Sequence, residues 1–194
     1  MLIGVPTEIK QDEHRVGLTP TSVRELVHHG HQVLVQSNAG AGIGMSDEDY
    51  ARAGASIATT AADIYARAAM IVKVKELQAV EFPLLRAGQL LFTYLHLAPD
   101  AGQTRMLLDS GVVAIAYETV TGPNHSLPLL SPMSEVAGRM AVQAGAHCLE
   151  REAGGPGILL GGVPGVESAK VVVLGGGVVG TNAIRVAIGM EAQV

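Results

Sequence analysis

The fold class follows from one stretch of the chain, KVVVLGGGVVGTNAIRVAIG (Lys170–Gly189). After the lysine, residues 171–174 are continuously apolar, which predicts a β-strand buried on both faces. Gly175, Gly177 and Gly180 follow with the spacing G-x-G-x-x-G, and residues 181–189 predict a helix. A strand, this glycine turn and a helix in succession are the context in which the turn binds a dinucleotide. The alternative is a glycine-rich turn that only packs a helix on a strand.

Each glycine of this turn has its own physical role in a Rossmann unit. Gly175 permits the tight turn, Gly177 lets the backbone approach a pyrophosphate, and Gly180 allows close packing of helix on strand. The helix N-terminus adds N–H donors and a partial positive charge for the phosphates. An acidic residue for the ribose is expected about 20 residues further on, which lies beyond the last residue, Val194. We therefore expect Val194 to open the second strand of a truncated NAD-binding domain, and the choice between NAD and NADP stays open.

Upstream of the turn, short apolar runs alternate with segments that carry helix signals. Thr19 and Pro20 are typical of a helix start and Gly30 of its end; further helices are predicted over 100–110 and 133–152. Strands that alternate with helices indicate βαβ units, a parallel sheet and an α/β fold. The upstream strands that the apolar runs predict are Leu2–Val5, Gln32–Val35, Met70–Val74, Gln89–Tyr94 and Val112–Tyr117.

The predicted organisation is a Rossmann-like, parallel-sheet substrate domain followed by the start of the truncated NAD-binding Rossmann domain. The substrate domain covers residues 1–130, and the cofactor domain begins at residue 170. Residues 131–169 between them combine a bridging helix with a loop rich in glycine and proline.

Composition narrows the class of protein. The chain has 194 residues and a net charge of −5, from 18 acidic and 13 basic side chains, which argues against a nucleic-acid partner. No apolar run reaches the ~18 residues of a membrane span, and the N-terminus has no signal-peptide pattern. One cysteine excludes an internal disulfide, and no Cys, His or carboxylate spacing resembles a metal site. We expect a cytoplasmic protein with neither a membrane nor a nucleic acid as partner.

Four polar residues follow predicted strands. Arg15 lies in the loop after the first strand, whereas Lys75, His96 and Glu118 come directly after later ones. Ligands of open parallel sheets bind at the carboxyl ends of the strands, so we expect these side chains at one edge. Arginine and lysine suit a small carboxylate, and histidine exchanges protons near neutral pH. Beside a nicotinamide, this set predicts reduction of a 2-oxo acid. Taken alone, a lysine or arginine in a loop is more often a solvated charge.

Two segments resemble the signatures of one known family, that of alanine dehydrogenase and pyridine nucleotide transhydrogenase. The first segment runs from Gly4 to Gly30 and contains GVPTEIK and EHRVGLTP; the second is the glycine turn with its helix. Asp12, Gly17 and Val179 depart from the usual Asn, Ala and Ala of the family. Further family-like segments lie between the two, so the resemblance covers the whole chain.

The resemblance implies the reversible, NAD-dependent oxidative deamination of L-alanine to pyruvate and ammonium, carried out by a homo-oligomer that is usually a hexamer. Arg15 and Lys75 would hold the substrate carboxylate, and His96 would be the catalytic acid and base. The other implied contacts are Tyr94 and Leu130 for the pocket wall, Ser134 for the cofactor, and Gly175, Gly177, Val178, Val179 and Gly180 for its phosphates.

Family members are about twice as long as this chain, which implies a partial enzyme with little or no turnover alone. The alternative function is the NAD(H)-binding domain of a proton-translocating transhydrogenase, which has no carboxylic acid to hold. A dehydrogenase for a larger 2-oxo acid and a non-catalytic fragment are the remaining hypotheses. The presence of Arg15, Lys75 and His96 together favours the dehydrogenase.

Overall fold

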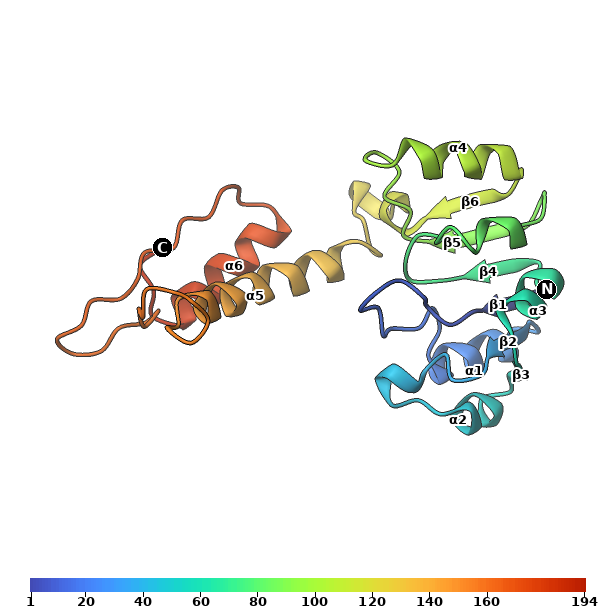
Figure 1. Ribbon diagram of the computed structural model, residues 1–194, viewed down its shortest axis with the longest axis horizontal. Helices are drawn as coiled ribbons and strands as arrows, with labels where there is room; N and C mark the ends of the chain where they lie inside the picture. The colour runs from blue at the N-terminus through green and yellow to red at the C-terminus, as the bar shows by residue number, and fades with distance from the viewer. The chain divides into compact units, whose positions relative to one another are not determined.

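The computed structural model describes residues 1–194. They form two compact units, Met1–Val120 and Thr121–Val194. The first unit contains a β-sheet with helices, and the second contains two longer helices with a connecting loop (Figure 1).

A parallel sheet forms the centre of the first unit. Its six strands lie in the order β3-β2-β1-β4-β5-β6 (Figure 1), and every neighbouring pair is parallel. This is the strand order of a Rossmann sheet, and it confirms the predicted fold class. The strands are β1 (Leu2–Val5), β2 (Gln32–Gln36), β3 (Ser56–Ala58), β4 (Met70–Val72), β5 (Leu90–Thr93) and β6 (Val113–Ala116).

The sequence predicts five of these strands and misses β3. β3 is only three residues long, Ser56–Ala58, and Ile57 is its single large apolar residue, so no apolar run marks it in the sequence. The predicted strand over 70–74 ends earlier, at Val72.

Local signals set the ends of the helices in this unit. The Thr19 hydroxyl accepts a hydrogen bond from the Ser22 N–H at 3.3 Å, and Pro20 opens α1 as predicted. Asp100 caps α4, and Gly111 closes it with a φ of 68°. The helices are α1 (Pro20–His28), α2 (Asp47–Arg52), α3 (Ala61–Arg67) and α4 (Ala101–Ser110), with 3-10 turns η1 (Ala41–Ile43), η2 (Phe82–Leu84) and η3 (Tyr117–Thr119).

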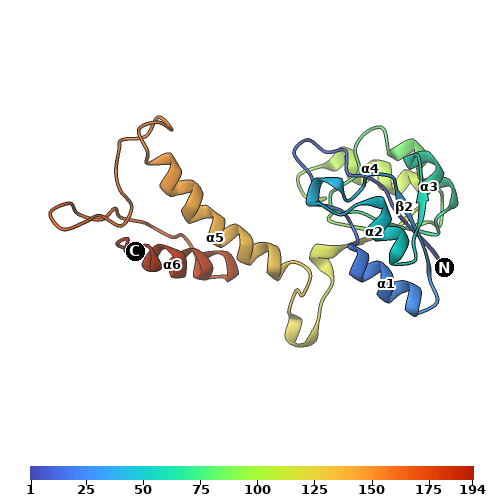
Figure 2. The same ribbon diagram turned by 90° about the horizontal axis from the view of Figure 1, so that it is seen from below.

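The two faces of the sheet bury separate cores, as strand geometry requires. Val33 and Val35 belong to a cluster with residues of α1 and α2. Leu34 lies between them in the sequence and belongs to a second cluster, with residues of α3 and α4. Successive side chains of a strand point to opposite faces, so β2 is buried on both. Figure 2 shows α1 and α4 on opposite sides of the sheet.

The strand order reverses between β1 and β4. From β1 the chain passes through β2 and β3 on one side, and then returns to place β4 on the other side of β1. Open α/β sheets bind ligands at the carboxyl ends of the strands at such a point. The loops that follow β1 and β4 are therefore the first place to look for a site.

Two helices dominate the second unit. They are α5 (Ser131–Cys148) and α6 (Val178–Gly189), which pack side by side (Figure 2), and η4 (Pro123–His125) precedes them. Gly138 of α5 permits the close approach, because a Cβ there would lie 2.2 Å from the carbonyl oxygen of Val179. The side chains buried between these helices and the loop are Val142, Leu160, Ala183 and Ala187.

The predicted strand over 170–174 is wrong as a regular strand. Lys170 makes one isolated parallel bridge with Gln193, and the remaining residues pair with no strand. Val172 and Leu174 are 74% and 93% exposed. A β-strand is defined by its hydrogen bonds to neighbouring strands. The apolar pattern of residues 171–174 is therefore not sufficient to make them a regular strand.

Candidate functional site

The polar residues predicted at strand ends lie on one edge of the first unit. Arg15 is in the loop after β1, Lys75 follows β4, His96 follows β5, and Glu118 lies in η3 after β6. Strands β1, β4, β5 and β6 are successive neighbours in the sheet and run parallel. The topology therefore brings the ends of these four strands together, as the sequence predicted.

Arg15 is held by a carboxylate two residues before it. The Arg15 Nε donates to Glu13 Oε1 at 2.8 Å and its Nη2 donates to Oε2 at 2.6 Å, a bidentate pair. The backbone N–H of Arg15 also donates to Oε1, at 2.9 Å. This pairing raises the pKa of Arg15 and lowers the pKa of Glu13. The guanidinium is thus charged and fixed at the sheet edge.

Lys75 is held through its backbone. Its N–H donates to Glu8 Oε1 at 3.4 Å, and the N–H of Val74 donates to the same oxygen at 2.6 Å. Its carbonyl oxygen accepts a hydrogen bond from the Thr93 hydroxyl at 2.8 Å. Loops after β1 and β4 and the end of β5 are thereby joined at the position of Lys75.

A buried ion cluster lies behind Lys75. The Lys73 ammonium is fully buried and lies 3.1 Å from Glu8 Oε2 and 2.8 Å from Glu81 Oε1. The Tyr65 hydroxyl donates to Glu81 Oε1 at 2.9 Å, and burial, reinforced by the Glu81 charge, raises the pKa of Tyr65, so this proton stays in place. Buried charges persist when they are paired and hydrogen-bonded.

Sequence patterns did not predict that Glu8, Lys73 and Glu81 form a group. One signal was present: Lys73 interrupts the apolar run from Ile71 to Val74, and a charge inside a buried strand requires a partner. The partners come from two distant segments, which sequence spacing does not reveal.

His96 stands beside Tyr94 with an unusual backbone. The two rings are stacked, with centroids 5.8 Å apart and planes 8° from parallel. Burial raises the pKa of Tyr94, an effect that the charge of Arg15 partly opposes. His96 has a φ of 50°, in the left-handed region that few residues other than glycine adopt. Both backbone N–H groups at this point, of Leu95 and His96, donate to the carboxylate of Glu118.

Glu118 therefore differs from Arg15, Lys75 and His96, because its side chain binds the protein backbone. It follows its strand as predicted, but its oxygens accept hydrogen bonds from the backbone of the β5 loop. The three residues predicted to meet the substrate are alike in one respect. Arg15, Lys75 and His96 each donate their backbone N–H to a glutamate.

The glycine turn lies in the second unit, at the start of α6. Gly175 has a φ of 96°, which only glycine adopts easily. A Cβ at Gly180 would lie 1.9 Å from the carbonyl oxygen of Gly175, so this glycine is required by packing. The helix begins at Val178, three residues before the predicted start, and no side chain caps it. The first N–H groups of a helix have no partner within the helix, so this end suits an anion.

Packing within the fold does not explain Gly177. Its φ of −69° is open to any residue, and a Cβ there, as at Gly176, would meet no atom within 4 Å. The space that this Cβ would fill lies at the uncapped helix start. The absence of a side chain therefore leaves room for a group that approaches the backbone, as a pyrophosphate does in a Rossmann turn.

The two other predicted contacts are also in the second unit. Leu130 immediately precedes α5, and its carbonyl oxygen accepts the Ser134 N–H at 3.1 Å. Ser134 lies in the first turn of that helix and is half-buried.

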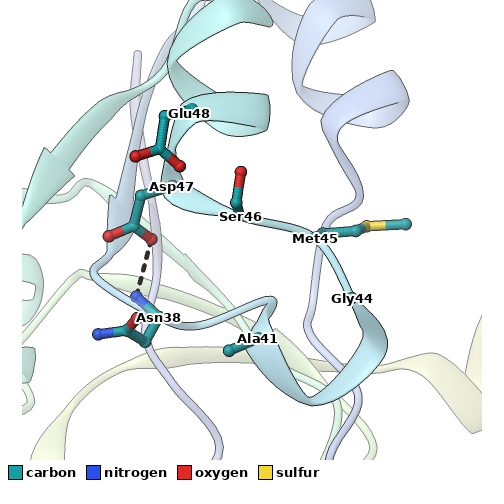
Figure 3. Close-up of a pocket in the computed structure, with 7 residues that line it drawn as sticks. All are labelled: Asn38, Ala41, Gly44, Met45, Ser46, Asp47 and Glu48. Carbon is teal, nitrogen blue, oxygen red and sulfur yellow. Dashed lines mark hydrogen bonds between the residues drawn. The ribbon is translucent and has the colours of Figure 1, made fainter.

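A pocket of the first unit lies in the loop after β2, between Asn38 and Glu48 (Figure 3). Asp47 points across it, accepting hydrogen bonds from the Asn38 N–H at 2.8 Å and the Ser37 hydroxyl at 2.6 Å. Its carboxylate is thus used to shape the loop. A second cavity, of about 440 Å³, is lined by His96 together with Lys10, Glu76 and Gln103. This second cavity is the one that adjoins the predicted site.

Two kinds of site have no candidate in the structure. No group of three or more His, Cys, Asp or Glu side chains is placed to hold a metal ion. No helix has the length and apolar character needed to cross a membrane.

Fold and strand-end residues together define a Rossmann-like α/β protein with a charged edge at the reversal of its strand order. The model of the alanine dehydrogenase/PNT N-terminal domain matches residues 4–137, and that of the C-terminal domain matches residues 141–194. The chain therefore belongs to the alanine dehydrogenase/PNT family.

Individual relatives extend this result along the whole chain. Alanine dehydrogenases of Halomonas elongata and Methanococcus maripaludis are 59% and 56% identical over 194 residues. A solved L-alanine dehydrogenase superimposes with a TM-score of 0.92 at 57% identity, covering 100% of this chain and 54% of the other. A transhydrogenase from Sinorhizobium meliloti gives 0.81 at 27% identity, covering 99% and 55%. The chain spans about half the length of the curated relatives it matches, 52% in both cases.

Proposed function

We propose that this chain serves an NAD-dependent L-alanine dehydrogenase, which deaminates L-alanine reversibly to pyruvate and ammonium. One observation carries the proposal: Arg15, Lys75 and His96 follow adjacent strands at the reversal point of the sheet. The chain that holds them is more than half identical, over its full length, to proteins named alanine dehydrogenase.

The charges at this edge suit a 2-oxo or 2-amino acid. Arg15 and Lys75 would bind the carboxylate, since arginine offers a planar fork and lysine a point charge. Glu13 and Glu8 fix the two residues in place. His96 would exchange a proton with the substituent on the second carbon, and Tyr94 and Leu130 would form the pocket wall.

The glycine turn would bind the cofactor. Gly175, Gly177, Val178, Val179 and Gly180 would surround the phosphates of NAD, with Ser134 as a further contact. When bound, NAD accepts or returns the hydride of the substrate. In this proposal, residues 1–130 bind the substrate, residues 131–169 form the bridge, and residues 170–194 begin the cofactor domain.

The transhydrogenase function is the weaker alternative. Its solved relative has the same architecture, but it shares 27% identity against 57% for the L-alanine dehydrogenase.

We also propose a homo-oligomer, the hexamer that the family resemblance implies. Val136 and Met140 on α5 are 46% and 58% exposed, and exposed apolar side chains on one helix are typical of a subunit contact. Light scattering on the purified protein measures the mass directly, and a monomer at micromolar concentration would contradict this point.

The test is NADH oxidation by the protein expressed from its full reading frame, with the 194-residue chain assayed in parallel. We expect oxidation that requires both pyruvate and ammonium, and little or none from the 194 residues alone. Binding of NADH without turnover would favour the transhydrogenase. Turnover with a longer 2-oxo acid but not with pyruvate would replace alanine as the substrate.

A further inference from the structure

We propose that Glu118 is a positioning residue, which sets the direction of the His96 imidazole by holding the backbone beneath it. The proposal rests on the proposed function for the role of His96. The hold itself is visible in the structure: the His96 N–H donates to Glu118 Oε1 at 2.7 Å, and the Leu95 N–H lies 3.1 Å and 3.3 Å from the two carboxylate oxygens.

The backbone at His96 needs such a hold. A φ of 50° places a side chain with a Cβ in the left-handed region, which is unfavourable for residues other than glycine. Successive N–H groups that converge on one point form a concave site for an anion. Here the anion is the protein's own carboxylate, so the pair of hydrogen bonds favours the strained conformation over the extended one.

The loop is also held from its other side. The Leu95 carbonyl oxygen accepts a hydrogen bond from Gln103 Nε2 at 2.6 Å. Gln103 belongs to α4 and is buried. Leu95 is thus fixed at both its N–H and its C=O by side chains from two other elements, which leaves the residue after it little freedom.

The neighbour of Glu118 completes the arrangement. Tyr117 meets the Tyr94 ring edge-on, with centroids 5.0 Å apart and planes at 88°, and Tyr94 in turn stacks on His96. Two adjacent residues of η3 therefore fix His96, one through its backbone and one through the ring on which it lies. The register of β5 and β6, in which Thr93 is opposite Ala116, places η3 beside the β5 loop.

The first test follows the conformation in the 194-residue chain by NMR. A left-handed residue gives a strong NOE between its own amide and α protons, and the stacked Tyr94 ring displaces the imidazole resonances. We expect Glu118→Ala to remove both signals at His96, whereas Glu118→Gln, whose amide oxygen still accepts a hydrogen bond, restores much of them. Thr119→Ala is the matched control, because its hydroxyl donates to the Ala116 carbonyl oxygen at the end of β6 and not to the β5 loop. Signals that persist in a folded Glu118→Ala chain would overturn the proposal.

The second test uses turnover by the protein from its full reading frame. Misplacing a catalytic group by about 1 Å costs on the order of 10²-fold, so we expect that loss in kcat for Glu118→Ala, with KM for pyruvate changed less than about threefold. In a His96→Ala background, Glu118→Ala should cost nothing more, since coupled residues are not additive. A further loss in that background would show that Glu118 acts elsewhere. If the unmodified protein has no turnover, the proposed function fails, and the NMR result alone decides whether Glu118 positions His96.

Discussion

The two units differ in how far apart in the sequence the residues that shape their candidate sites lie. In the first unit, the glutamates that hold Lys75 and His96 lie 67 and 22 residues away in sequence. In the second unit, the glycine turn is made by neighbours: the Thr181 hydroxyl donates to the Gly176 carbonyl oxygen, five residues earlier, at 2.9 Å. Long-range contacts thus hold Lys75 and His96 at the substrate edge, where only Arg15 is held by a near neighbour, Glu13, and local contacts shape the phosphate turn.

The two units also differ in whether their apolar runs form regular strands. The strands of the first unit have neighbours, so their apolar patterns become a regular sheet. Residues 171–174 have the same kind of pattern but form no regular strand, and Val172 and Leu174 are exposed. The turn that follows them is formed all the same, with Gly180 packed directly against the Gly175 carbonyl oxygen.

The largest effect should come from the buried ion cluster of the first unit. Lys73→Met would leave Glu8 and Glu81 buried without their cation, and removing one partner of a buried pair costs about 3–5 kcal/mol. We expect this loss in the free energy of unfolding measured with urea, and little change for the exposed Lys170→Met as control. Equal stabilities of the two variants would show that the cluster contributes nothing to the first unit.

A smaller but still large effect should fall on the second unit alone. Gly180→Ala places a Cβ 1.9 Å from the Gly175 carbonyl oxygen, and overpacking of this kind costs about 1–3 kcal/mol. Hydrogen exchange should accelerate in α6 and leave β1 and β4 protected. Gly189→Ala, in the same helix and with open space around its Cβ, is the control. Faster exchange throughout the first unit would contradict the prediction that the effect is confined to the second unit.

At Gly177, we expect a substitution to change NADH binding without changing stability. The methyl group of Gly177→Ala would meet no protein atom, so we expect the melting temperature to stay the same. The affinity for NADH should fall about tenfold, because the methyl group would keep a pyrophosphate from the backbone. Gly176→Ala, which also meets no atom within 4 Å, should bind NADH nearly as well as the unmodified protein. Fluorescence titration with NADH measures the affinity of each variant. Equal losses of NADH affinity in the two variants would contradict the proposed contact between Gly177 and the pyrophosphate.

The smallest effect concerns pH. The hydrogen bonds from Arg15 lower the pKa of Glu13 below its ordinary value of 4.5. The pair therefore contributes its full stability above that value and loses it as the pH falls through the lowered pKa. Melting temperatures of the unmodified protein and of Glu13→Gln should differ by a constant amount between pH 7 and pH 5, and converge at lower pH. Parallel curves down to pH 3 would refute the pairing.

The sequence predicted the parallel α/β fold, and also which residues follow the strand ends, because both depend on local patterns. Apolar runs marked β1 and β4, and the spacing of Gly175, Gly177 and Gly180 marked the turn. The supporting contacts were only partly within reach of such reasoning. The strand pattern placed Glu118 at the same edge as His96 but did not predict its hydrogen bonds to the backbone of Leu95 and His96. Glu8 reaches Lys75 only after the sheet has formed, and no periodicity in the chain links the two residues.

The most direct test of the central claim compares two variants at the sheet edge, Arg15→Ala and His96→Ala, in the protein from its full reading frame. If the edge binds a 2-oxo acid as proposed, Arg15→Ala should raise KM for pyruvate by at least about tenfold and leave NADH binding intact, consistent with the loss of a charge-assisted pair. His96→Ala should instead lower kcat by about 10²-fold or more, the usual contribution of a general acid and base. An unchanged KM in the first variant, or a surviving kcat in a folded second variant, would contradict the assignment of this edge to the substrate.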